Sequence, residues 1–233
     1  MMSVDGLQAH YGKSHVLRGV TFSVGRGEVV SLLGRNGSGR STALKAIMGL
    51  VPPSAGRVDL NGRALAGAPP HTICRAGLAY VPEEREVFAN LTVDENLRMG
   101  EQPPVAGAAR WNVAQMFDYF PRLKERRGTK AGSLSGGEQQ MLTMCRSLLG
   151  NPLAILIDEP TEGLAPKIVA QVAECITEMQ SRGVAVVLVE QKLAIALKVS
   201  TRVCVMGHGR IVFEGSPEQL QADHEMLAQW LAV

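Results

Sequence analysis

The stretch "GRNGSGRST", from Gly34 to Thr42, lies between the apolar run "EVVSLLG" and the helix-like segment "ALKAIMGL". Its glycine spacing matches the phosphate-binding loop G-x-x-x-x-G-K-S/T, except that Arg40 stands where the motif has lysine. Three interpretations are open: a working nucleotide site with a changed cation, a disabled site, or a chance arrangement of glycines. The rest of the chain has to decide between them.

The glycines of this stretch would let the backbone turn tightly, so that successive N–H groups face the oxygens of a phosphate. The helix that follows would present the positive end of its dipole to the same anion. Ser41 also supplies a hydroxyl suited to Mg²⁺. The candidate phosphate-binding residues are Gly34, Asn36, Gly37, Ser38, Gly39, Arg40, Ser41 and Thr42. A strand-to-helix turn with Ser/Thr capping would give the same pattern, so the loop alone does not establish a function.

The composition is that of an ordinary soluble globular protein. The chain has 233 residues, with 45% hydrophobic and 20% charged side chains, enough for one large domain or two small ones. A formal net charge of +2 gives no basic field that would suggest nucleic acid as the main partner. The N-terminus lacks the apolar stretch of a signal peptide, and no apolar run is long enough to span a bilayer. Any role at a membrane would therefore require docking to another protein.

The order of the predicted elements indicates a mainly parallel α/β core. "HVLRGVTFSV" alternates apolar and polar residues like a strand, and "VPPSAGRVDLNGRAL" predicts a strand that ends in an Asn-Gly turn. Residues from about 92 to 150 predict several helices. The buried strands "PLAILIDEP" and "GVAVVLVEQ" flank a helical segment, and "TRVCVMGHGRIVFEG" predicts a hairpin before a helical tail.

A second motif is "LSGGEQQ", from Leu134 to Gln140. Ser135 followed three residues later by Glu138 predicts a capping box at the start of a helix. The capping box does not explain Gly136 and Gly137, because glycine in a helix costs up to about 1 kcal/mol relative to alanine. Bare backbone at this place would let an anion approach closely. The stretch resembles the signature sequence of ABC transporter ATPases, and the resemblance runs from residue 3 to the end of the chain.

A third motif is "LAILIDEP", in which Asp158 and Glu159 end an apolar strand. Carboxylates at the carboxyl edge of a parallel sheet lie where such sheets bind ligands. Asp158 is suited to hold Mg²⁺ through water, and Glu159 to polarise the attacking water. An Asp-Glu-Pro turn that merely ends the strand is the alternative. The phosphate loop, the signature and the acidic strand nevertheless follow one another in the order and spacing of the family.

The resemblance implies roles for further residues. Tyr11 matches the aromatic residue that stacks on adenine, although a tyrosine in the core would fit the strand nearly as well. Glu83 stands where many members have a glutamine that senses Mg²⁺ and the γ-phosphate, and Gln191 where most have a switch histidine. The implied catalytic pair is thus Glu159 and Gln191. The implied metal contacts are Ser41, Asp158 and Glu83.

The departures from the common pattern resemble one branch of the family, the ATP-binding subunits of branched-chain amino acid importers. "VPEEREVFANLTVDENL", "EGLAPKIV" and "VEQ" carry this resemblance, and the branch commonly has Glu and Gln at positions 83 and 191. Arg40 departs from this branch as well, since its members usually keep lysine.

The fold implied by the resemblance is a P-loop NTPase of the ABC ATPase type, one domain over residues 1–233. It would have a RecA-like α/β core, an N-terminal antiparallel β-region and an inserted α-helical subdomain near residues 86–150. ATP and Mg²⁺ at Gly34–Thr42 of one domain would be covered by Ser135–Glu138 of another, so that the chemistry needs a dimer. The segment Glu84 to Asp94 would contact a transmembrane permease.

The implied function is ATP hydrolysis that energises an importer, from the cytoplasmic face of the cell membrane. The partners would be a second ABC ATPase subunit (identical or related), transmembrane permeases and, indirectly, a periplasmic binding protein. Two alternatives stay open, namely an ATP-binding regulatory subunit with weak hydrolysis, because of Arg40 and Gln191, and the ATPase of a urea or amide importer. ABC ATPases of translation or DNA repair usually carry two ATPase domains or a long coiled coil, and the sequence shows neither.

Overall fold

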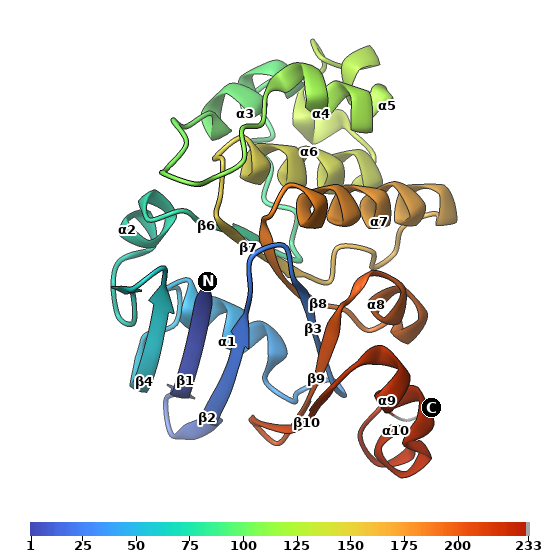
Figure 1. Cartoon of the computed structure of the whole chain (residues 1–233). Coiled ribbons are helices and arrows are strands. Elements are labelled where there is room, and N and C mark those ends of the chain that lie inside the picture. Colours follow the sequence, from blue (N-terminus) through green and yellow to red (C-terminus); the bar gives the residue numbers. More distant parts are fainter. Residues whose placement is uncertain (232–233) are drawn as a thin grey trace.

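The computed structural model describes residues 1–231 as two β-sheets with helices packed around them (Figure 1). The smaller sheet is antiparallel, with the strand order β2-β1-β4-β5. Its strands are β1 Met2–Tyr11, β2 Ser14–Val24, β4 Pro53–Leu60 and β5 Arg63–Ala64. The Asn61-Gly62 pair lies in the turn between β4 and β5, as the sequence predicts.

The larger sheet forms the core and has the strand order β10-β9-β3-β8-β7-β6. Its strands are β3 Val29–Leu33, β6 Leu78–Val81, β7 Ala154–Asp158, β8 Ala185–Val189, β9 Arg202–Gly207 and β10 Arg210–Gly215. All neighbours pair in parallel except β9 and β10, which form the predicted hairpin. Every residue of β3, β7 and β8 is buried, as expected for parallel strands covered on both faces.

The two faces of the core sheet pack against different layers. Along β7, Ala154 and Leu156 face the side of helix α1 (Arg40–Ile47) and the antiparallel sheet. Ile155 and Ile157 face the opposite side, where α6 (Gly136–Leu148) and α7 (Pro166–Ser181) supply the apolar contacts. This alternation fixes the carboxyl end of β7 between two packed layers.

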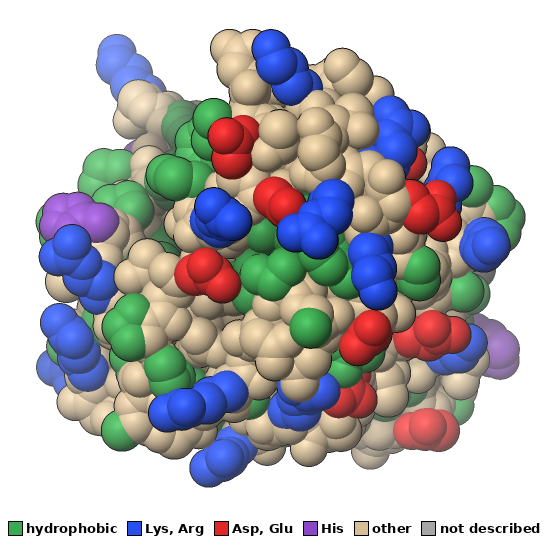
Figure 2. Space-filling view, turned by 90° about the horizontal axis from the view of Figure 1, so that it is seen from above, with side chains coloured by type: hydrophobic (Ala, Val, Ile, Leu, Met, Phe, Trp, Pro, Cys, Tyr) green, Lys and Arg blue, Asp and Glu red, His purple; other side chains and the backbone are tan. Residues whose placement is uncertain are grey.

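The described chain between β6 and β7 is helical, as the sequence predicts, and Figure 1 places these helices at one end of the molecule. They are α3 Val93–Gly100, α4 Val113–Tyr119, α5 Pro121–Glu125, the short 3₁₀ helix η1 Ala131–Ser133, and α6. Capping boxes start α3 at Thr92 and α4 at Asn112. Figure 2 views the molecule from this end and shows basic and acidic side chains interspersed, without a field of one sign.

The remaining helices lie at the edges of the core. They are α2 Pro70–Arg75, α8 Leu193–Val199, α9 Pro217–Ala222 and α10 His224–Trp230. The last two form the predicted helical tail beside β9 and β10 (Figure 1), whereas α2 and α8 are additions that the sequence did not predict. Among residues 1–231, no helix has both the length and the apolar character needed to cross a bilayer.

Candidate functional site

The loop between β3 and α1 owes its shape to glycine. Gly34, Gly37 and Gly39 have φ angles of 148°, 79° and 104°, a region that other residues rarely adopt. A Cβ atom on Gly34 would also lie only 2.8 Å from Ser38 Oγ. The loop therefore needs these glycines to turn tightly before α1.

The loop forms one wall of a cavity of about 340 Å³. The cavity is lined by Asn36, Gly37, Ser38, Gly39, Arg40, Ser41, Thr42, Glu83, Glu159, Glu162 and Gln191. It thus brings together the loop, the candidate proton acceptor and two of the residues that the resemblance singles out. Tyr11 and the signature residues do not line it.

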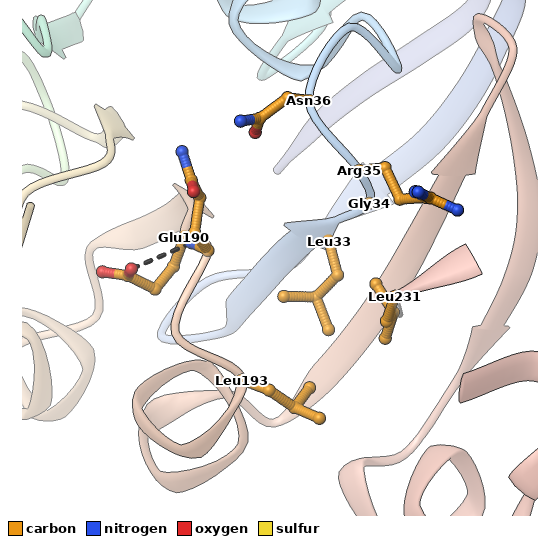
Figure 3. A pocket seen from close by; sticks show the side chains of 8 residues that line it. Leu33, Gly34, Arg35, Asn36, Glu190, Leu193 and Leu231 are labelled. Carbon is orange, nitrogen blue, oxygen red and sulfur yellow. Dashed lines mark hydrogen bonds between the residues drawn. The ribbon is translucent and has the colours of Figure 1, made fainter. Parts of the chain in front are cut away.

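A second hollow of about 380 Å³ lies beside the first and shares Asn36 and Gln191 with it. In Figure 3 the side chains of Leu33, Leu193 and Leu231 face a common space, and Arg35 points away from them. This hollow is the larger one, and three leucine side chains form part of its lining. The carboxylates and the arginine suited to phosphate chemistry line the smaller cavity, which we take as the site.

Arg40 is buried, with 5% of its surface exposed, and its guanidinium group crosses the cavity to Glu159. Nη2 lies 3.3 Å from Glu159 Oε1 and 3.3 Å from Asn36 Oδ1, while Nη1 donates over 3.3 Å to the Glu190 carbonyl. All these distances exceed the usual 2.9–3.0 Å of N–H···O bonds. The guanidinium is therefore held by several long contacts, which an arriving anion could replace.

Glu159 follows β7 directly and is held from both sides. Its φ of 45° is unusual for a residue with a side chain, a conformation that costs on the order of 1–3 kcal/mol and is often found at functional sites. Its Oε1 faces Arg40, and its Oε2 accepts a hydrogen bond of 2.5 Å from Gln191 Nε2. Burial raises the pKa of Glu159 despite the opposing effect of Arg40. A raised pKa makes this carboxylate a better proton acceptor.

Asp158 is fully buried at the end of β7, and its carboxylate accepts hydrogen bonds from two hydroxyl groups. Ser41 donates to its Oδ1 over 3.0 Å, and Tyr80 donates to its Oδ2 over 3.2 Å. Burial, followed by the nearby Asp158 charge, raises the pKa of Tyr80, which keeps this phenol protonated as a donor. Tyr80 is a site residue that the sequence did not reveal. The one feature that could have indicated it is the tyrosine hydroxyl group on the short strand β6, which pairs with β7.

Three carboxylates that line the cavity lie close together. Oxygen atoms of Glu83, Glu159 and Glu162 all lie within 4.8 Å of one another. Burial raises the pKa of Glu83, and the negative charges of Asp158 and Glu162 raise it further. Oxygen ligands are those that Mg²⁺ prefers, and a cation would relieve this repulsion. Together with the Ser41–Asp158 pair, these donors fit a magnesium ion.

The signature residues lie at the start of α6, away from the cavity. Ser135 N–H donates to Glu138 Oε2 over 2.8 Å, and Glu138 N–H donates to Ser135 Oγ over 3.4 Å, which is the predicted capping box. The sequence offered no structural reason for Gly136, and in the structure the atoms nearest to the place of its missing side chain belong to the end of a flexible arginine. The guanidinium group of Arg85 occupies the place that a side chain at Gly136 would need. Arg85 is thus a second residue near the candidate motifs that sequence patterns did not reveal.

Tyr11 lies at the end of β1 with 51% of its surface exposed. The alternative of a core tyrosine is therefore wrong. The ring is open to solvent, outside the phosphate cavity.

A glycine loop lies between the buried strand β3 and a helix, and it faces carboxylates at the end of β7, a parallel strand separated from β3 by β8. This arrangement defines a nucleotide-binding α/β protein of the P-loop class. The family model described as ABC transporter matches residues 17–162, and the chain belongs to this family. The predicted family and fold are thereby confirmed, and the chain is an ATP-binding ATPase.

Relatives resemble the chain over nearly its whole length. The high-affinity branched-chain amino acid transport ATP-binding protein BraG of Pseudomonas aeruginosa is 43% identical, with 91% of each chain covered. The probable branched-chain amino acid transport ATP-binding protein LivF of Archaeoglobus fulgidus is 36% identical, with 97% of this chain and 95% of the relative covered. The lipopolysaccharide export ATP-binding protein LptB of Haemophilus influenzae is 30% identical, with 99% and 97% covered. A solved nucleotide-free ATP-binding cassette from an ABC transporter superposes with a TM-score of 0.83 at 25% identity, with 97% of each chain covered.

Proposed function

We propose that this chain is the ATP-hydrolysing subunit of an ABC importer for branched-chain amino acids. The observation that carries the catalytic part is the convergence of the glycine loop, Arg40, Glu159 and Gln191 on one cavity. The cargo is supported by the two branched-chain amino acid relatives and by the segments "VPEEREVF" and "EGLAPKIV". The 30% identity to the lipopolysaccharide export protein indicates that ATP-binding subunits of transporters with different cargoes share much of their sequence.

In this proposal, the residues Gly34–Thr42 bind the phosphates of ATP through backbone N–H groups and Arg40. Ser41 and Asp158 hold Mg²⁺, with Glu83 nearby, and the bound ion would offset negative charge on the phosphates. Glu159 orients a water molecule and accepts its proton on a carboxylate oxygen. Gln191 fixes the direction of that carboxylate through its 2.5 Å hydrogen bond.

The proposed site is completed by a second subunit. Ser135–Glu138 are remote from the cavity of their own chain, so they would cover the nucleotide of a partner, whose own signature covers this chain's ATP. Tyr11, exposed at the end of β1, is free to stack on adenine. We infer one domain over residues 1–233, with a helical subdomain near residues 86–150 inserted in the α/β core.

Docking to a transmembrane permease is assigned to the segment Glu84 to Asp94. It contains Phe88, a large apolar side chain that is 47% exposed, packed on the Arg146 guanidinium at 4.8 Å. An exposed aromatic ring of this kind suits burial by a partner. The chain would then act at the cytoplasmic face of the membrane, and a periplasmic binding protein would deliver the amino acid to the permease.

The ion pair between Arg40 and Glu159 favours a second candidate, an ATP-binding regulatory subunit with slow hydrolysis. An arginine that stays on Glu159 after ATP binds would hold the proton acceptor away from water. Single-turnover cleavage of ATP by the purified complex separates the two candidates. Cleavage at the rate of steady-state turnover supports the ATPase, and ATP bound without cleavage supports the regulatory subunit.

The variant Glu159→Gln tests the assigned role of the carboxylate. It should keep ATP affinity but lose at least about 100-fold in turnover, because the amide fills the same space without accepting a proton. The trapped dimer should then be visible by gel filtration in ATP and absent in ADP. Glu174→Gln, at an exposed position on α7, is the matched control. Normal turnover by Glu159→Gln would remove this residue from its role.

The cargo is tested on the transporter co-purified with a tagged form of this chain. Leucine, isoleucine or valine, added with the binding protein, should stimulate ATP hydrolysis by the reconstituted complex. Stimulation by urea or amides alone would assign the chain to the alternative importer, with the same ATPase chemistry.

A further inference from the structure

Glu190 is a buried carboxylate with no part in the chemistry described so far. It follows β8 directly, and 2% of its surface is exposed. None of the ion pairs formed among residues 1–231 includes it. A buried polar side chain needs hydrogen-bond partners, and both oxygens of Glu190 have them.

The hydrogen bonds of Glu190 connect two separate segments. Its Oε1 accepts from the backbone N–H groups of Gln191 and Lys192, both over 2.9 Å. Its Oε2 accepts from the hydroxyl of Thr161 over 2.7 Å, and Thr161 is fully buried. One carboxylate thus fixes the backbone at Gln191 with one oxygen and the start of the loop Thr161–Pro166 with the other.

One further contact ties the same segments together, and another joins Glu190 to Arg40. Lys192 Nζ donates to the Thr161 carbonyl over 3.0 Å. The Glu190 carbonyl accepts from Arg40 Nη1 over 3.3 Å. A displacement of Thr161 would therefore act on the backbone that carries Gln191, and on one of the contacts that hold Arg40.

Both segments are connected to Glu159, one along the chain and the other through a hydrogen bond. Thr161 is two residues after it in the chain, and Gln191 holds its Oε2. Glu159 N–H also donates to the Val189 carbonyl over 2.9 Å, so the backbone of β8 supports the residue as well. The orientation of the Glu159 side chain depends on the relative position of these two segments.

We propose that Glu190 is a positioning residue that couples the loop Thr161–Pro166 to Gln191, and through Gln191 to the carboxylate of Glu159. This inference rests on the proposed function, in which Glu159 accepts the proton of the attacking water. A change in the position of Thr161 then acts through Glu190 on the backbone of Gln191, the residue that orients Glu159.

A double-mutant cycle between Thr161 and Gln191 tests the coupling in the co-purified transporter. Thr161→Val removes the hydroxyl and keeps the shape. It should lower kcat about 10-fold while changing KM for ATP less than about twofold. In a Gln191→Ala background, the same substitution should lower kcat less than about twofold, because the coupled residue is already lost. Thr161→Ser should restore kcat to within about threefold of wild type.

Thr177→Val provides the matched control, since it also removes a threonine hydroxyl, one bonded within α7 to the Ala173 carbonyl. It should leave kcat unchanged in both backgrounds. Equal fold losses from Thr161→Val with and without Gln191 would overturn the coupling, as would a wild-type kcat for Thr161→Val. If Thr161→Val unfolds the chain, Thr161→Ala and Thr161→Ser replace it in the cycle. The fold losses in kcat with and without Gln191 are then compared in the same way. Failure of the proposed function would show separately, as normal turnover by Glu159→Gln.

Discussion

Arg40 raises, at the scale of a single residue, the question of how a phosphate loop works with an altered cation. In the structure the partners of Arg40 are Glu159 and Asn36, and in our proposal phosphate oxygens take their place. Arginine keeps the charge and donates to phosphate in a bidentate manner, but it is a planar fork rather than a compact ammonium group. The long contacts of 3.3 Å to Glu159 and Asn36 leave room for such an exchange.

From this we expect Arg40→Lys to retain or raise ATPase activity, because lysine would fit the loop and release Glu159. Arg40→Ala should weaken ATP binding by roughly 1.5–3 kcal/mol, the range for hydrogen bonds to charged groups. Nucleotide titration and steady-state turnover measure the two effects. The same ATP affinity for wild type and Arg40→Ala would show that the side chain stays on Glu159 when nucleotide is bound.

At the scale of secondary-structure elements, an ion pair joins the starts of two neighbouring strands, β3 and β9. Glu28, just before β3, accepts from Arg202 Nε over 2.8 Å at the start of β9, and from the Gly25 N–H over 2.6 Å. Partial burial favours the neutral acid, but the hydrogen bonds from Arg202 and Gly25 outweigh it, so that the pKa of Glu28 lies below its ordinary value of 4.5. The folded state thus prefers the charged carboxylate.

A lowered folded-state pKa adds stability above the unfolded-state pKa, and this stability is lost as pH falls through the folded-state pKa. Glu28→Gln should therefore lower the free energy of unfolding at pH 7 by up to about 1 kcal/mol, since the pair is partly exposed. The difference from wild type should shrink as the pH falls below 4.5. Denaturant unfolding at a series of pH values measures it. A difference that is constant with pH would mean that the charge of Glu28 is not involved.

The elements that sequence patterns predicted are those with local signals. The capping box at Ser135 and the Asn61-Gly62 turn each depend on residues within a few positions of one another. The short helices α2 and α8 were missed, since they have too few turns for a clear apolar period. Contacts between distant parts were missed as well: nothing in the sequence shows that Tyr80 reaches Asp158, or that Arg85 fills the space beside Gly136. Such partners become visible only when the sheet and the helical layer are assembled.

At the scale of the whole molecule, the phosphate cavity and the start of α6 lie in different parts of one chain. The proposed reaction therefore needs two cassettes, identical or related, and a substitution at Ser135 should act on the partner's nucleotide. Ser135→Arg should abolish hydrolysis by the complex, because a bulky cation would stand where the signature must approach ATP. Binding of nucleotide to the chain's own loop should stay nearly intact.

The control for Ser135→Arg must account for the cap, because Ser135 also starts α6, and losing an N-cap costs about 0.5–2 kcal/mol. Asn112→Arg removes an equivalent capping box at the start of α4, away from the motifs. It should lower thermal stability by a similar amount and leave turnover within about twofold of wild type. Nucleotide affinity of the isolated chain is measured for both variants. If Ser135→Arg weakens that affinity as strongly as Arg40→Ala does, then Ser135 contributes to the site of its own chain, and the two-cassette arrangement is wrong.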